Sequence, residues 1–520
     1  MVAPAKAPRR AIRLAADAQR VSRNAGAHRG SLSKWRAPET ISLSQQAGER
    51  NIAQNRAADL AVNDWAASSA VNAITLNAVG TGLRPQLRLN AKRLGISPEA
   101  ARELQAEIET IFNRWTPYAH VRGLLHFEDL QFLGLRTMLR VGELVHLPVM
   151  SDDPYRPLGL AIQDVSPRRL RTPFDLANDP SIVDGVEMSA AGAPQAYWIA
   201  TPPPNYAPGL GFSVLPSGFF TRVPARVGHR PGCFHLYRYL EDEQVRGESI
   251  FTPGINLFRH LSDSLDNELL AQVVTASLAL FIAKEAGGPR VPDFVREEPG
   301  KEGEKPYYYE EVEPGTVMYG NKDEKPYVLE SSRPSPNFAS FSEFVLRAMA
   351  ASVDMPYEVI SKDFSKTNYS SARAALLEAW RVFSLYRAWL VRHYCQPVLR
   401  MVIEEAWLAG LLKFPAAAPD FYDAAGDYCN AIWIGPPRGY VDPVKEVAAT
   451  VTALENRLMT YSEAIAERGR DFEEVMDERE EEEARMAIMR PIQKTDGGGQ
   501  KTGNQKQAIA HEENYEPAAV

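Results

Sequence analysis

A polar loop between two amphipathic segments holds the side chains best suited to bind a ligand. Its basic residues are Lys362 and Lys366, and Asn368 and Ser370 follow where a helix is predicted to restart. Exposed ammonium groups bind phosphate as point charges. Pro356 is predicted to end the preceding helix, and the Ser370 hydroxyl is predicted to cap the next one by accepting from its first free amides. The loop is therefore expected to be held at both ends; the alternative is two solvated lysines without a function.

Other candidate chemistries find less support. Gly300-Lys301-Glu302 lacks the hydroxyl that a phosphate-binding loop supplies to magnesium. His229, Cys233 and His235 form a tight group of metal-binding residue types, but no second pair of ligands follows at zinc-like spacing. We therefore predict no enzyme, no catalytic residue, no metal and no cofactor. A cytosolic hydrolase with its site in the Pro-rich region 151–250 is the alternative, although no nucleophile and base stand at a recognisable spacing.

The composition is that of a folded chain. The 520 residues are 45% hydrophobic and 24% charged, which is ordinary for a globular protein. The three cysteines are far apart and odd in number, so a disulfide framework is not predicted and a reducing compartment is favoured. No stretch reaches the roughly 18 consecutive apolar residues that a membrane span needs. We expect no membrane partner.

Charge is distributed unevenly along the sequence. The net charge of −8 argues against a protein that grips nucleic acid over a large face. Residues 1–50 hold ten Lys or Arg and three Asp or Glu, whereas residues 451–490 hold twelve acids and six bases. We expect 1–50 to form a basic N-terminal arm and 491–520 a disordered tail. Any contact with DNA must then be local.

The spacing of apolar residues predicts helices mixed with short strands, which is typical of the α+β class. Helical periodicity covers 51–79, Pro98–Trp115 and Phe127–Val141. Alternating or β-rich runs predict strands at Leu83–Leu89, Leu144–Met150, Tyr197–Ile199, Phe234–Tyr239 and Ile432–Ile434. After the polar loop a long helix is predicted, with Pro397 expected to kink or break it.

Two long amphipathic segments carry apolar faces that one subunit is not expected to bury. The first segment, 256–285, is predicted to be one helix. The proposed subunit-contact residues on the two segments are Leu261, Leu265 and Leu269 on the first and Phe341 and Val345 on the second. We expect these faces to pack against neighbouring copies around a rotational axis.

A Pro-rich insert lies between these two segments. Residues 286–336 hold eleven acids and seven bases. The aromatic runs Tyr307–Tyr309 and Val317–Tyr319 predict a small β unit there.

Short motifs, in the same order along the chain, resemble those of the lambda-type portal proteins of tailed phages. They are Asn63–Ala66, Val71-Asn72, Gly80–Gly82, Gly142-Glu143, Arg246–Glu248 with Phe251 and Leu257, Asn368–Arg373, Trp433 with Asp442–Glu446, and Glu467–Asp471. The resemblance covers about residues 50–490. One departure is Arg457–Thr460, where the family often has a glycine.

The resemblance implies a portal fold that assembles as a ring, usually of twelve subunits. Its expected regions are an α/β wing at 51–255 with 395–440 returning to it, a two-helix stem at 256–285 and 337–354, a β-containing clip at 286–336, a tunnel loop at 355–370, a long helix at 371–394 and a helical crown at 441–490. The apolar and polar patterns independently predict two long helices around a β insert, followed by a constrained loop, which is the same order.

The resemblance also implies a role at one capsid vertex, where double-stranded DNA is packaged, retained and ejected. On this hypothesis Lys362 and Lys366 face the channel, and Asn368 and Ser370 brace the loop. A few lysines give weak, sequence-independent contact that lets DNA slide, whereas a continuous basic wall would trap it.

The implied partners are other phage proteins. The acidic clip, with Glu310, Glu311 and Glu313, is expected to dock the terminase large subunit and later the head-tail adaptor proteins. The major capsid protein and the scaffold are further expected partners, and the expected location is the virion after assembly in the host cytoplasm. A baseplate or tail subunit shares the ring but does not explain the stem and clip order.

Overall fold

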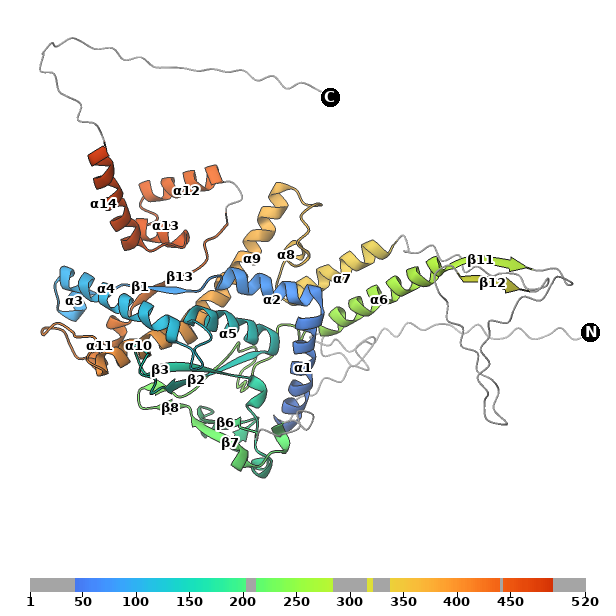
Figure 1. The fold of residues 1–520 in the computed structure, drawn as a ribbon, viewed down its shortest axis with the longest axis horizontal. Helices are drawn as coiled ribbons and strands as arrows, with labels where there is room; N and C mark the ends of the chain where they lie inside the picture. The colour runs from blue at the N-terminus through green and yellow to red at the C-terminus, as the bar shows by residue number, and fades with distance from the viewer. Residues whose placement is uncertain (1–42, 203–211, 284–315, 321–336, 440–442, 490–520) are drawn as a thin grey trace, which may run out of the picture. The chain divides into compact units, whose positions relative to one another are not determined.

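The computed structural model describes residues 43–202, 212–283, 316–320, 337–439 and 443–489 (Figure 1). The chain divides into two compact units, Met1–Val441 and Asp442–Val520. Helices and strands are both present throughout the first unit, so the α+β class is confirmed. Among the described residues, no helix is long and apolar enough to cross a membrane.

The first unit begins with a group of helices. These are α1 (Leu43–Asn63), α2 (Trp65–Ala78), α3 (Ala91–Leu94), α4 (Pro98–Trp115) and α5 (Phe127–Val141). The last two have the predicted bounds, because Ser97 caps α4 and the left-handed Gly142 ends α5. The single helix predicted over 51–79 is wrong, since the Asp64 carboxylate accepts from the Ala67 amide at 2.8 Å and starts a second helix.

The strands of the first unit form small sheets. A three-stranded antiparallel sheet has β2 in its centre, flanked by β3 and β10, and a four-stranded sheet has the order β4-β5-β6-β7. Two short pairs are β8 with β9 and β1 with β13. The bounds are β1 Arg84–Leu87, β2 Glu143–Met150, β3 Leu160–Val165, β4 Ile182–Val183, β5 Val186–Met188, β6 Pro194–Ala200, β7 Phe220–Pro224, β8 Arg226–Val227, β9 Arg230–Pro231, β10 Phe234–Tyr237 and β13 Ala431–Ile434. Strands are therefore present at all five predicted positions.

Helices α6 (Ile255–Ser277) and α7 (Phe338–Ser352) pack against each other. The helix predicted over 256–285 is too long, because Leu278–Ala283 form β11 and pair in parallel with β12 (Thr316–Gly320). A short apolar run such as Leu278–Ile282 suits a strand as well as a helix, and the pairing partner decides. The predicted strand at Val317–Tyr319 is confirmed by β12, while Tyr307–Tyr309 lies outside the described residues.

The chain returns to the first unit through α8 (Tyr357–Ser361), α9 (Tyr369–Leu390), α10 (Gln396–Leu408) and α11 (Phe421–Tyr428). A π-helical turn, Val391–Cys395, separates α9 from α10. Pro397 has no amide hydrogen, so the regular hydrogen-bond ladder fails there, and the Gln396 amide donates to Val391 O five residues back. The predicted irregularity at Pro397 is confirmed.

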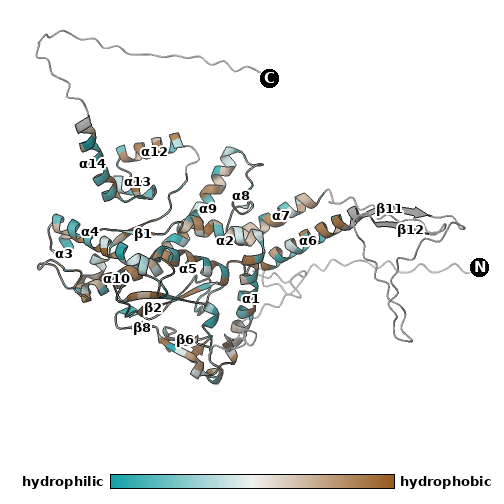
Figure 2. Ribbon diagram, viewed as in Figure 1, coloured by the Kyte–Doolittle hydropathy of each residue, from teal (hydrophilic) through white to brown (hydrophobic). Residues whose placement is uncertain are grey.

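Buried aromatic rings from these helices form the centre of the core. Trp115, Phe127 and Tyr394 are fully buried, and the ring centroids of Phe127 lie 5.4 Å from Trp115 and 5.7 Å from Tyr394. Trp115 Nε1 donates to Leu160 O at 2.8 Å, which fixes α4 to β3. Figure 2 shows that apolar residues also continue along α6 and α7, where many stay exposed.

The second unit contains α12 (Pro443–Glu455), α13 (Tyr461–Glu467) and α14 (Phe472–Met489). Helix α12 ends in a Schellman motif, in which Leu458 N donates to Ala453 O and Arg457 N to Leu454 O. The residue at the left-handed position is Arg457, with φ 58°. A glycine would adopt this conformation without steric strain.

Arg457→Gly is expected to stabilise the second unit. The left-handed conformation costs an L-residue roughly 1–2 kcal/mol, and the freedom of an unfolded glycine offsets roughly 0.5–1 kcal/mol of that gain. We expect a net increase of about 0.5–1 kcal/mol, measured by hydrogen exchange of the α12 amides. Arg468→Gly is the control, because Arg468 has φ −88° and gains nothing. Unchanged or faster exchange in Arg457→Gly would contradict the assignment.

Candidate functional site

The predicted loop, 355–370, is not irregular throughout, because it contains the short helix α8 at Tyr357–Ser361. The rest of the loop lies between α8 and α9, and packing fixes its first end. Pro356 does not end the preceding helix as expected; α7 ends at Ser352, and Pro356 is the N-cap of α8. The Ser69 hydroxyl of α2 donates to Ile360 O at 2.7 Å. Arg347 of α7 lies over the Tyr357 ring, 5.5 Å from its centroid. Two helices therefore hold α8 before the loop begins.

The second end of the loop is capped by a different residue from the one predicted. Asn368 has extended backbone angles, and its side-chain oxygen accepts from the Ser371 amide at 2.8 Å. Ser370 lies in the first turn of α9 and is exposed. Helix α9 starts two residues before the predicted 371, because Asn368 caps it in place of Ser370.

The middle of the loop is ordered by local hydrogen bonds. The Asp363 carboxylate accepts from the Ser365 amide at 2.9 Å and from the Ser365 hydroxyl at 2.6 Å. Thr367 N donates to Phe364 O at 3.1 Å, which closes the following turn. The hydrogen bonds to Asp363 hold the pKa of its carboxyl below the usual range. The loop therefore presents its lysines from a defined backbone.

The two lysines have different surroundings. Lys366 Nζ lies 2.9 Å from a carboxylate oxygen of Glu343 on α7, and this pairing raises the pKa of Lys366. Glu343 also pairs with Arg347 at 2.7 Å. Lys362 is exposed, has no ion pair within the described part of the chain, and adopts the left-handed conformation with φ 56°. Lys362 thus has no acidic partner among the described residues, whereas Lys366 is paired with Glu343 of α7.

Sequence reasoning missed Glu343 and Arg347. They stand four residues apart on a predicted helix, which is a recognisable spacing for an ion pair along one face. The contact between Glu343 and Lys366 cannot be predicted from helical spacing, because the two residues are 23 positions apart. Only the packing of α8 against α7 brings the loop to this carboxylate.

The proposed subunit-contact residues divide by exposure. Leu261 is 3% exposed and packs in the core of its own subunit, so it offers almost no surface to a neighbour. Leu265 and Val345 are partly buried against that core. Leu269 and Phe341 are 60% and 56% exposed. The expected subunit contact therefore rests on the last two residues. The proposed docking glutamates Glu310, Glu311 and Glu313 lie outside the described residues.

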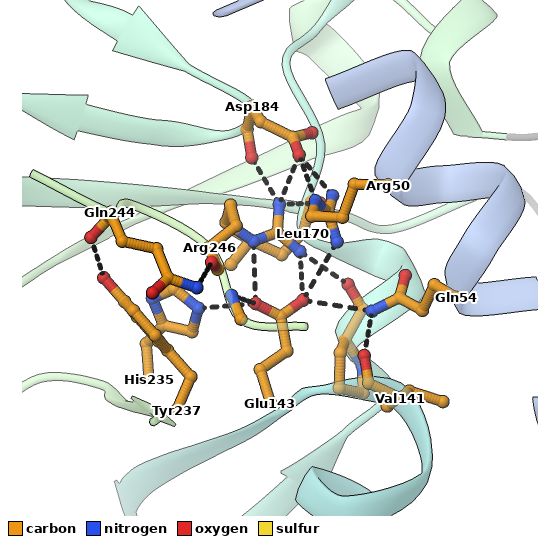
Figure 3. A network of polar contacts seen from close by, with 12 residues as sticks. Arg50, Gln54, Val141, Glu143, Leu170, Asp184, His235, Tyr237, Gln244 and Arg246 are labelled. Atoms are coloured by element: carbon orange, nitrogen blue, oxygen red, sulfur yellow. Dashed lines mark hydrogen bonds and ion pairs between the residues drawn. The ribbon is translucent and has the colours of Figure 1, made fainter. Parts of the chain in front are cut away.

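A network of buried ion pairs lies within the first unit, apart from the loop (Figure 3). Arg246 Nε lies 2.8 Å from one oxygen of Glu143, and Arg246 also contacts the other oxygen. His235 Nε2 lies 2.9 Å from Glu143, and Arg50 Nε lies 2.9 Å from Asp184. Burial opposes ionisation of Glu143, but Arg246, His235 and Arg50 hold its pKa well below the usual range. The carboxylate is charged and fully paired.

The network gives a structural role to two motifs whose role could not be assigned from the sequence. Gly142-Glu143 ends α5, and Arg246–Glu248 precedes α6, about a hundred residues later. A Cβ on Gly247 would lie 2.1 Å from Gly142 O, and one on Gly142 would lie 2.5 Å from the Glu248 backbone. The glycines let the two backbones touch, and the ion pair forms beside that contact.

Two buried histidines make folding sensitive to acid. Burial lowers the pKa of His146 to about 4, and burial also lowers the pKa of His235. The Tyr394 hydroxyl lies 2.7 Å from His146 Nδ1. Below about pH 6.5 these histidines bind protons in the unfolded chain but stay neutral in the folded chain. The free energy of unfolding therefore decreases as the pH falls.

We expect the free energy of unfolding to fall by about 3 kcal/mol between pH 7 and pH 4 from His146 alone. His146→Gln removes the titrating group, so its unfolding curve in urea should depend less steeply on pH. The exposed His229 gives the matched control, and His229→Gln should keep the wild-type slope. Parallel pH profiles for wild type and His146→Gln would contradict the assignment.

His229, Cys233 and His235, the group considered as a weak metal candidate, do not face one another. His235 faces Glu143, Cys233 is buried in an apolar cluster, and the His229 ring centroid lies 4.6 Å from that of Tyr422, with the rings tilted. Within the residues that the structure describes, no group of three potential ligands converges on a metal site.

The sequence matches the family model described as "Phage portal protein, lambda family" over residues 28–387. It is 27% identical to a portal protein of Escherichia phage N15 over 504 residues, which cover 90% of each chain. It is 25% identical to portal protein B of Escherichia phage lambda over 490 residues, which cover 89% of each. A probable portal protein of Halomonas phage phiHAP-1 is 25% identical over 434 residues, 81% of this chain and 78% of the relative.

Among solved structures, one chain in the neck of a native GTA particle, computed with C12 symmetry, is similar at 14% identity. The match covers 80% of this chain and 96% of that one, with a TM-score of 0.35. This value is too low to support a comparison of the two folds.

Proposed function

The chain belongs to the lambda family of phage portal proteins, a structural component of the virion, and on that premise we propose that it forms a ring, expected to contain twelve copies, through which double-stranded DNA is packaged, retained and ejected. The observation that supports a DNA contact is the braced loop, which carries Lys362 as an exposed, unpaired cation on an ordered backbone among the described residues.

The wing, stem, clip and crown divisions remain part of this proposal. Helices α6 and α7 fit the two stem helices, and β11 with β12 fits the start of the clip. The exposed apolar residues Leu269 and Phe341 fit a contact between stems in the ring. The small helical second unit, α12 to α14, fits the crown.

Within the channel we propose unequal roles for the two lysines. Lys362 contacts passing phosphates, because its charge is not compensated among the described residues. Lys366 mainly holds the loop to α7 through Glu343 and contributes less to DNA contact. Asn368 braces the loop as the cap of α9, and Ser370 stands exposed at the same end. Contacts of this kind are screened within roughly 8 Å at physiological salt, so they act on DNA already inside the ring.

The proposed partners are the terminase large subunit during filling, the head-tail adaptor proteins afterwards, and the major capsid protein and scaffold during assembly in the host cytoplasm. The acidic insert with Glu310, Glu311 and Glu313 is the proposed docking surface, since its charge favours steering of a basic partner.

The lysine assignment is tested with Lys362→Gly in assembled rings. Glycine suits the left-handed conformation, so the loop keeps its shape while the charge is removed. The log–log slope of duplex affinity against salt should become shallower by about 0.9 for each phosphate that the variant ring no longer neutralises. Lys413→Gly, at an exposed lysine elsewhere, should change nothing. Normal assembly with an unchanged slope and unchanged DNA retention would make Lys362 an ordinary solvated residue.

A further inference from the structure

A groove outside the loop is lined in part by arginines that have no assigned ligand. It has a volume of about 520 Å³ and lies between α1 and α5, over β2 and β3. Arg140 of α5 and Arg168, which follows β3, line it, and Arg136 stands one helical turn before Arg140. Like charges one turn apart on a helix repel each other. Arg136 and Arg168 therefore repel Arg140 in an isolated subunit.

Arg140 is the residue that most clearly lacks a partner. Its Nε is shielded from solvent and has no hydrogen-bond partner among the described residues. Burial lowers the pKa of Arg140, and repulsion from Arg136 and Arg168 lowers it further. Within the described part of the chain, none of the three arginines has an ion pair. The Nη groups of Arg140 are not among the buried unpartnered atoms, and a guanidinium can bind a carboxylate through two parallel hydrogen bonds.

Two acids also line the groove: Asp164 is ion-paired, whereas Asp59 is exposed and accepts only from an amide. Asp164 contacts Arg122 at 2.7 Å and His120 at 2.9 Å, and Asp59 accepts from Asn63 at 2.7 Å. These carboxylates would repel the phosphates that flank any single phosphate contact in a duplex. One helix brings only the few carboxylates on its own face, whereas a duplex places phosphates beside these acids on both sides of any contact. The groove therefore favours a protein carboxylate over nucleic acid.

A matching acidic ridge lies on α4. Glu99, Glu103 and Glu107 are exposed and follow one another at four-residue intervals, so they share one face of the helix. Arg102 offsets part of the charge near Glu99, whereas Glu103 and Glu107 have no ion pair within the described ranges. The ridge repels itself, as the arginine groove does.

The ridge and the groove lie on opposite sides of the first unit. Helix α4 packs on α10 and β1, while α1 packs on α2 and α5. Figure 1 shows α4 and α1 on either side of α5 and the β2–β3 pair. The two charged surfaces cannot meet within one chain in this arrangement. A head-to-tail contact between identical copies brings such surfaces together and, when the rotation closes, produces a ring.

We propose that the α4 ridge of one copy docks into the α1–α5 groove of the next, with Glu103 and Glu107 pairing with Arg140 and Arg168. The inference rests on the proposed ring and adds a specific contact to it. Exposed apolar groove residues such as Val62, 67% exposed, would pack against the aliphatic stems of the incoming glutamates.

Two charge reversals test the contact by complementation. The first variant carries Arg140→Glu with Arg168→Glu, and the second carries Glu103→Arg with Glu107→Arg. Each variant alone places like charges opposite each other at every contact. Native mass spectrometry should therefore show a ring yield reduced about tenfold or more relative to wild type. An equal mixture should restore rings, because each altered surface then finds its altered complement and each unaltered surface its normal one. The restored rings should contain both variants in equal number.

Controls separate this inference from the proposed ring. Arg226→Glu and Glu241→Arg reverse exposed charges away from both surfaces and should leave rings intact. Full-size rings from either charge-reversal variant alone would overturn the contact while the ring stands. Failure of the wild type to form rings would overturn the proposed function instead.

The milder pair Arg140→Gln and Glu103→Gln provides a second measurement if the reversals disturb folding. Ring dissociation in a double-mutant cycle should show coupled effects, and strictly additive effects would also overturn the contact.

Discussion

Arg246→Met is expected to lower the free energy of unfolding by about 3–5 kcal/mol, because it leaves the buried Glu143 carboxylate without its main partner. The side chains of Glu143 and Arg246 are 0% and 4% exposed, so water cannot take the place of the guanidinium. Arg246 also donates to Leu170 O at 3.0 Å, and that carbonyl is left without this donor in the same variant. Urea unfolding at pH 7 measures the change.

The matched control is Arg222→Met, which breaks the exposed ion pair with Glu187 at 2.8 Å. The side chains of that pair are 47% and 24% exposed, and exposed pairs contribute about 0.2–1 kcal/mol. The same chemical change should therefore have a several-fold smaller effect. Equal destabilisation of the two variants would show that the buried network does not have the role assigned to it.

Leu269→Asp is expected to prevent ring assembly without unfolding the subunit. Leu269 is 60% exposed in the single chain, so a charge there is solvated until a neighbour covers it. Burying an unpaired carboxylate in the ring contact would cost several kcal/mol at each interface. Native mass measurement should show subunits in place of rings, with a wild-type unfolding curve.

Leu265 is a poorer test of the same contact, because it packs partly against the core of its own subunit. Leu240→Asp is the matched control, since Leu240 is 57% exposed but lies outside α6 and α7. Rings should form normally in that variant. If Leu269→Asp also forms full-size rings, α6 does not contact its neighbour at this position.

Local features of the sequence determined much of the secondary structure. Pro98–Trp115 and Phe127–Val141 formed helices with the predicted bounds, because apolar spacing and end signals agree at both. Pro397 interrupted its helix because a missing amide hydrogen acts through neighbouring residues alone. The family likewise followed from the order of short motifs, which needs no knowledge of contacts.

The tertiary structure decided what depends on partners distant in sequence. The helix predicted over 256–285 ended at Ser277, since β12 was available to pair with the apolar run that follows. Lys362 and Lys366 look equivalent in the sequence, but only Lys366 lies beside Glu343. Apolar periodicity identifies a buried face without stating which surface covers it, so it could not separate buried Leu261 from exposed Leu269.

The ion network shows most clearly the difference between what the sequence determines and what the tertiary structure determines. The sequence presented Glu143 and Arg246 as parts of two separate motifs, and their charges alone suggested no pairing. Their contact depends on two backbones meeting at Gly142 and Gly247. Chain folding brings these backbones together, and the low dielectric of the interior then makes the pairing necessary. Residue type determined what each side chain could bind, and tertiary packing determined which partner it found.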